Sequence, residues 1–140
     1  MLCTLFGGIE MSHGWIKDKF FRVAPLGITV NAEAADVITV DLALVDQAGD
    51  AIAEARDFLA EVLDVNAELA LVGAFTLDET GAGAEVTAST RPALIITTSA
   101  GGLAQLSVTD VAGASGLTVY VKITPMDLRG APTLTAITFD

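Results

Sequence analysis

The amino-acid sequence predicts an all-β protein built as a sandwich or barrel of short antiparallel strands. Several segments alternate apolar and polar residues with a period of two, the pattern of a strand with one face turned to a core. Turn signals rich in Gly, Asp and Pro separate these segments roughly every 8–12 residues. Hydrophobic residues make up 52% of the 140 residues, which suffices for the core of one domain, or of one domain with an arm.

The most regular segment is DVITVDLALVDQAGD at residues 36–50. Its apolar residues at even positions from 38 to 44 share one face of a strand expected at 37–45. The residues DQAGD (46–50) end this strand with turn chemistry, since Gly accepts a positive φ and Asp bonds its own backbone. A brief strand at 28–30 and a turn at 31–35 precede it.

Residues 51–65 (AIAEARDFLAEVLDV) fit two patterns. Ile52, Ala55, Leu59 and Val62 sit at helical spacing, and Ala, Glu and Leu are good helix formers. The same stretch also alternates as a strand would, and it follows a Gly-Asp turn after a regular strand, which favours a hairpin. We predict a strand, with a helix as the alternative.

The remainder of the chain continues the strand pattern. The segment 68–77 is apolar, with β-favouring residues towards its end, and 78–83 is a loop. Further extended pieces are expected at 85–88, 93–98, 103–109, 117–124 and 133–139. The segment 117–124 (LTVYVKIT) alternates most cleanly, with Leu117, Val119, Val121 and Ile123 on one face.

Residues 1–27 differ from the body at 28–140, and we interpret them as an N-terminal arm. They hold four of the eight aromatic residues and three of the seven basic residues. Such a segment either folds back on the body or lies across a partner subunit, and we favour the partner because the body already forms a complete domain. The expected interface residues are Trp15, Lys17, Lys19, Phe20, Phe21 and Arg22.

The charge is strongly acidic and unevenly placed. The net charge is −11, which disfavours binding to nucleic acid through a basic face. Residues 1–24 hold three basic and two acidic side chains, whereas the remaining residues hold four basic and 16 acidic ones. A cationic arm could dock on the acidic body of a neighbouring copy. Alternatively, the charge serves only the solubility of the body.

No catalytic or metal-binding constellation is visible in the sequence. His13 is the only histidine and Cys3 the only cysteine, so the chain lacks the residues for a zinc site or an internal disulfide. The carboxylates at 46–54 lack the ligand spacing of an EF-hand loop. No apolar run is long enough for a transmembrane helix, and Met1–Ile9 is a poor signal peptide. We expect no enzyme activity, no cofactor and no metal.

From residue 37 onward the chain resembles a group of small Ig-like proteins encoded among the structural genes of tailed bacteriophages. The similarity rests on VITVDLALVDQAGDAIAEAR (37–56), the loop ETGAGAEV, the hairpin ALIITTSAGGLAQLSVTD, and LTVYVKITPMDLRGAPTLTAITF with its Tyr-bearing strand and terminal AITF strand. The chain departs from the family pattern in the longer turn at 125–130, in the Ala- and Leu-rich region 51–72, and in the arm, which has no counterpart.

The resemblance implies an Ig-like β-sandwich of about seven short strands with an extended N-terminal arm. It also implies a capsid decoration or cement protein that binds the major capsid protein and neighbouring copies of itself. Such a homo-oligomer would lie on the virion surface after assembly in the host cytoplasm, without contact to membrane or nucleic acid. The alternatives are a phage neck or tail protein and a carbohydrate-binding adhesion module, for which Tyr120 is the one plausible sugar platform in the body.

Overall fold

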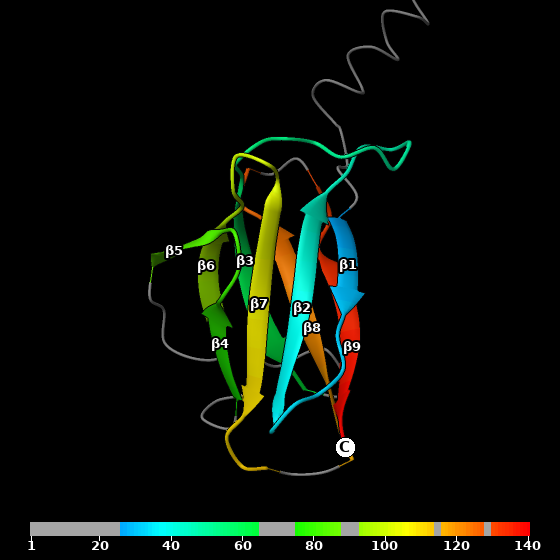
Figure 1. The fold of residues 1–140 in the computed structure, drawn as a ribbon, viewed down its shortest axis with the longest axis vertical. Helices are drawn as coiled ribbons and strands as arrows, with labels where there is room; N and C mark the ends of the chain where they lie inside the picture. The colour runs from blue at the N-terminus through cyan, green and yellow to red at the C-terminus, as the bar shows by residue number, and fades with distance from the viewer. Residues whose placement is uncertain (1–25, 65–74, 88–92, 114–115, 128–129) are drawn as a thin grey trace, which may run out of the picture.

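A computed structural model describes residues 26–64, 75–87, 93–113, 116–127 and 130–140. These residues contain nine β-strands and no helix, so none of them forms a helix able to cross a membrane (Figure 1). The strands are β1 (Leu26–Val30), β2 (Val37–Leu44), β3 (Asp57–Leu63), β4 (Phe75–Glu79), β5 (Ala84–Thr87), β6 (Ala93–Thr97), β7 (Leu103–Asp110), β8 (Leu117–Pro125) and β9 (Thr133–Phe139).

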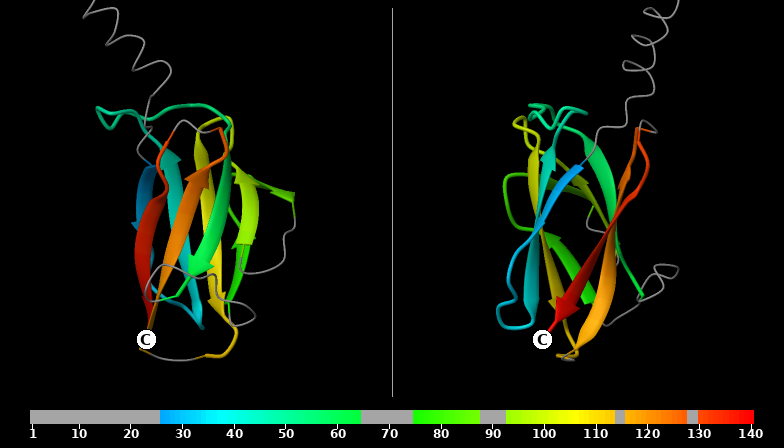
Figure 2. Two further views of the ribbon diagram at one scale, coloured as in Figure 1. Left: turned by 180° about the vertical axis from the view of Figure 1, so that it is seen from behind. Right: turned by 90° about the vertical axis from the view of Figure 1, so that its right-hand side faces the viewer.

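The strands form two antiparallel sheets that face each other as a sandwich (Figure 2). One sheet has the order β1-β2-β7-β4 and the other β5-β6-β3-β8-β9. With β5 and β6 set aside, the remaining seven strands have the order of a constant-type Ig domain, A-B-E-D facing G-F-C. The predicted Ig-like sandwich is therefore confirmed. The expected number of about seven strands is too low, because β5 and β6 are added between the fourth and fifth strands of the Ig pattern.

The alternating patterns place one face of each strand in the core. On β2 the side chains of Ile38, Val40, Leu42 and Leu44 are all buried, as the period of two predicts. On β8, Val119, Val121 and Ile123 are buried in the same way, but Leu117 is exposed. Burying a side chain of this size contributes about 1.5–3 kcal/mol. The rings of Phe75 and Phe139, with centroids 5.6 Å apart, join the two sheets.

The ambiguous stretch contains a strand, as predicted, and the helix alternative is wrong for residues 57–63. Strand β3 lies in the middle of its sheet, paired with β6 on one side and β8 on the other. Its alternate residues Phe58, Ala60 and Val62 point into the core. The helix-favouring composition is overridden because two neighbouring strands satisfy the backbone of β3 and the sandwich buries its apolar face.

Two turns position the ends of the strands. After β2, Oδ1 of Asp46 accepts hydrogen bonds from the backbone N–H groups of Ala48 and Asp50 at 2.8 and 2.9 Å, and Gly49 has a φ of 90°, which confirms the predicted turn chemistry. Between β6 and β7, Gly102 has a φ of 75°, and a Cβ atom there would lie 2.0 Å from the carbonyl oxygen of Ile52. Only glycine fits at that close approach.

Several strand boundaries differ from the expectation by one or two residues, and two of the differences concern edge strands. Strand β1 begins at Leu26, two residues before the strand expected from residue 28. Strand β4 extends to Glu79, into the predicted loop at 78–83, because its backbone pairs with β7 as far as that residue.

Candidate interaction surfaces

The six residues predicted to form an interface, Trp15, Lys17, Lys19, Phe20, Phe21 and Arg22, lie outside the described residues, as do His13 and Cys3. Within the described ranges, no group of three or more His, Cys, Asp or Glu side chains is placed to hold a metal ion. The surfaces available for interaction are therefore the edges and outer faces of the two sheets.

Among the described strands, β9 is an edge strand, and part of its backbone groups have no strand partner there. The N–H of Met126 donates to the carbonyl of Asp57, so even-numbered residues of β8 bond to β3. Because hydrogen bonding alternates along a strand, odd-numbered residues of β8 bond to odd-numbered residues of β9. The N–H and C=O groups of Leu134, Ala136 and Thr138 consequently point away from the sheet, and all three side chains are exposed.

The edge strand β1 has the same character. The N–H of Asn31 donates to the carbonyl of Thr39, so by alternation Gly27 and Thr29 bond to β2. The backbone groups of Ile28 and Val30 point outward. Strands β1 and β9 lie on the same lateral side of the sandwich, in contact with each other, and we call them together the uncharged side, because neither contains a charged residue or a proline (Figure 2, right).

The opposite lateral side consists of β4 and β5, and we call it the acidic side (Figure 1). Both strands are short, and they carry Asp78, Glu79 and Glu85. The carboxylate of Glu85 accepts a hydrogen bond from the outward N–H of Glu79 at 3.3 Å. The pairing of β5 with β6 is interrupted by a register shift between Glu85 and Thr87.

Charges, bulges and short strands are the devices by which proteins prevent an edge from pairing with another chain. The edge strands of the acidic side carry charges and a bulge, and β1 and β9 contain neither. Just after β9, the carboxylate of Glu33 accepts a hydrogen bond from the N–H of Asp140. The uncharged side is therefore the edge suited to accept a strand from a partner. The signal in the sequence was the absence of charge from LGITV and TLTAITF in a chain with 18 acidic residues.

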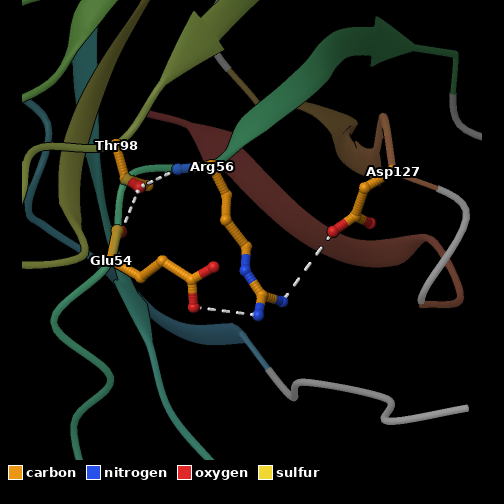
Figure 3. Close-up of polar contacts among 4 residues, drawn as sticks. All are labelled: Glu54, Arg56, Thr98 and Asp127. Atoms are coloured by element: carbon orange, nitrogen blue, oxygen red, sulfur yellow. Dashed lines mark hydrogen bonds and ion pairs between the residues drawn. The ribbon is translucent and has the colours of Figure 1, made fainter. Parts of the chain in front are cut away.

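Arg56 and Lys122 are the only basic side chains in the described residues. Nη2 of Arg56 lies 3.1 Å from a carboxylate oxygen of Glu54, and Nη1 lies 4.0 Å from Asp127 (Figure 3). The hydroxyl of the buried Thr98 donates to the carbonyl of Glu54 and accepts from the N–H of Arg56. The guanidinium is thus neutralised by two carboxylates, and the cluster anchors the start of β3 rather than offering an anion site.

A polar network crosses the outer face of the β1-β2-β7-β4 sheet. The carboxylate of Asp41 on β2 accepts hydrogen bonds from the side-chain amides of Asn31, at 2.9 Å, and Gln105 on β7, at 2.5 Å. These two hydrogen bonds, that from Asn31 being the stronger influence, lower the pKa of Asp41 below its ordinary value of 3.8. Asp41 therefore remains a carboxylate throughout the neutral range.

A groove of about 420 Å³ lies beside this network. Its floor is low because Gly27 and Ala43, which are partners in the β1–β2 register, have little or no side chain. Its walls include Leu103, whose side chain is 49% exposed, and the loop at Gly81 and Ala82. The loop is held against β7, because one carboxylate oxygen of Glu79 accepts hydrogen bonds from the N–H groups of residues 81, 83 and 105.

The outer face of the other sheet carries several apolar side chains. Leu59 and Ile95 are half-buried there, and Tyr120 lies opposite Ala136 of β9. Tyr120 is the only aromatic side chain of the described residues that is not buried in the core. A single half-buried tyrosine is a small platform for a sugar ring.

No protein-family model matches the chain, and no curated protein matches it. Among solved structures, two crystal structures of β-glucuronidase from Parabacteroides merdae, one with glycerol in its active site, are similar with TM-scores of 0.45 and 0.46. Sequence identity is 12% in both cases, over 84% of this chain. The chain spans 12% of the length of those enzymes, and a similarity of this degree is no basis for an argument about function.

Proposed function

We propose that this protein is a non-enzymatic virion structural protein that decorates and stabilises the head of a tailed bacteriophage. Its partners would be the major capsid protein and neighbouring copies of itself. The resemblance of residues 37–140 to Ig-like phage proteins suggests this role, and the Ig strand order is compatible with it. The virion would be the place where the protein acts, after assembly in the host cytoplasm.

The uncharged side is the observation that supports the proposal most directly. A cement protein strengthens a shell by adding main-chain hydrogen bonds between neighbours, and this requires an edge that accepts a strand. Leu134, Ala136 and Thr138 offer three outward N–H groups and three outward carbonyls on β9, next to the free edge of β1. A protein that acted alone in solution would gain from protecting such an edge.

The charge distribution supports a directional contact. All acidic side chains except Glu10, Asp18 and Glu68 lie in the described residues, where Arg56 and Lys122 are the only basic ones. Like-charged bodies repel one another on their faces, and the uncharged side is the approach at which that repulsion is weakest. The copies on a lattice would then be joined along β1 and β9.

Quantitative mass spectrometry of particles purified from the source of this chain tests the proposal. The copy number of the chain is compared with that of the major shell protein in the same particles. A ratio near one, or a simple fraction of it, is expected for a lattice-wide decoration protein. A handful of copies per particle would contradict the head assignment and favour a neck or tail protein. Absence from the particles would overturn the virion proposal and favour an adhesion module.

A further inference from the structure

The groove on the outer face of the β1-β2-β7-β4 sheet has two chemically distinct parts. One part is apolar and hollow, over Gly27 and Ala43. The other is anionic, at Asp41, whose carboxylate is oriented by Asn31 and Gln105. The volume of about 420 Å³ falls in the range of about 300–1,000 Å³ typical of pockets that hold small ligands or single large side chains.

The two parts are separated by one repeat of the strand. Ala43 and Asp41 are two residues apart on β2, so they share the outward face at a spacing of about 6.6 Å. An extended ligand segment with an aromatic residue at one position and a cation two residues later would place both side chains on one face at the same spacing. Such a segment would bury its ring in the hollow and set its cation beside the carboxylate.

The chain itself contains such a segment. Trp15 and Lys17 have this spacing, in a stretch where basic residues outnumber acidic ones. Trp is also the residue type that most often anchors protein interfaces. We infer that Trp15 and Lys17 of one copy dock in this groove of a neighbouring copy, with the indole over Gly27 and Ala43 and the ammonium group at Asp41. This inference rests on the proposed function, because it names the contact by which copies join.

The segment is long enough to dock in the groove of a neighbouring copy. Ten residues lie between Trp15 and the start of β1 at Leu26, and the eleven residue steps of an extended stretch there span up to about 36–40 Å. This exceeds the roughly 27 Å of the eight-residue strand β2. The arm therefore has the reach for a neighbour.

Trp15 is the only tryptophan in the chain, so its emission reports the docking directly. The donor is the full chain at low concentration, and the acceptor is the full chain with Trp15→Ser, which is dark and cannot dock. We expect the emission of the donor to shift to the blue as the acceptor is added, with saturation. Added salt weakens the binding, because one contact is an ion pair.

Two acceptor variants and a matched control locate the site. Ala43→Phe fills the hollow, and Asp41→Asn removes the charge with little change of shape; each is expected to weaken binding about tenfold or more. The control, Val86→Phe, adds the same side chain to an exposed position on the other sheet, away from the uncharged side, and leaves binding unchanged. Circular dichroism establishes that each variant is folded. Lys17→Ala in the donor and Asp41→Asn in the acceptor should show non-additive effects.

Several outcomes would overturn the inference. One is an emission that does not respond to the acceptor; another is a blue shift already present in the donor alone at every concentration, which means docking within the chain. A third is equal weakening by Ala43→Phe and Val86→Phe. The measurement uses pure protein without particles, so its failure leaves the copy-number result standing. Conversely, absence of the chain from particles would leave a measured docking intact.

Discussion

The two lateral sides of the sandwich are built from strands of similar length and solve the same problem in opposite ways. On the acidic side, Glu85 covers an outward N–H of β4, and a register shift interrupts β5. On the uncharged side, the outward backbone groups within β1 and β9 make no hydrogen bond to a charged side chain of the described residues, and Glu33 covers only the N–H of Asp140 after the end of β9. Because both sides rest on one shared core, the difference reflects what each edge is required to do, not the stability of the fold.

The largest expected effect comes from proline at two adjacent positions of β9. The N–H of Thr135 bonds to β8, so Thr135→Pro leaves a carbonyl of β8 without its donor and lowers the free energy of unfolding by about 1–3 kcal/mol. The N–H of Ala136 points outward, so Ala136→Pro leaves stability nearly unchanged while it prevents strand addition. Urea denaturation followed by circular dichroism gives the stabilities.

Occupancy on purified heads completes this test, with Ala136→Pro expected to bind poorly despite its native stability. Equal loss of stability in the two proline variants would contradict the alternation of hydrogen bonds along β9, from which the outward backbone groups of the uncharged side were assigned.

A second, smaller effect is expected from adding a positive charge to one lateral side or the other. Leu134 on β9 and Val86 on β5 are matched in exposure, at 51% and 52%. A lysine at either exposed position should change the free energy of unfolding by no more than about 0.5 kcal/mol. Leu134→Lys places a charge beside the open edge and is expected to lower head occupancy about tenfold, whereas Val86→Lys should bind as the parent does. If both variants bind equally well, the uncharged side is not the contact.

The smallest effect concerns how the uncharged side is held in place. Asp41 ties Asn31, at the end of β1, to Gln105 on β7. Since its pKa is lowered by folding, its contribution to stability is present above the unfolded pKa of 3.8 and is lost as the pH falls through the lower folded pKa. Below about pH 4 the free energy of unfolding of Asp41→Asn should therefore decrease less than that of the parent protein, by at most about 1 kcal/mol.

Denaturation of the parent and of Asp41→Asn at pH 6, 4 and 3 measures this contribution. A parent and variant that lose stability in parallel across that range would show that the carboxylate does not secure β1.

Much of the fold was predictable from local patterns. The strand at 37–45, the face formed by its even-numbered residues and the turn at Asp46 required only a period of two and the chemistry of Asp and Gly. The closing strand at 133–139 was predicted with the bounds that the structure has. These features depend on neighbours in the sequence, so an inspection of residues side by side was enough.

For residues 57–63 the sequence was compatible with a strand and with a helix, and pairing within the sandwich made them a strand. Phe58, Ala60 and Val62 have a helix-compatible sequence, but β6 and β8 come from about 30 to 70 residues away and supply the hydrogen bonds that make a strand. The added pair β5 and β6 was missed as an extension of the Ig pattern for the same reason. Local propensity has no information about which distant strand is available as a neighbour.

The sequence by itself determined that the chain is all-β, which residues of most strands face the core, and that acidic charge dominates the body. Only the tertiary structure decided which strands are edges, that Glu85 covers one edge while Leu134, Ala136 and Thr138 leave another open, and that Gly27, Ala43 and Asp41 share one groove. The physical reason is that the side of the sheet to which a side chain points follows from alternation along one strand. The pairing of backbone groups follows from register between strands that are remote in sequence.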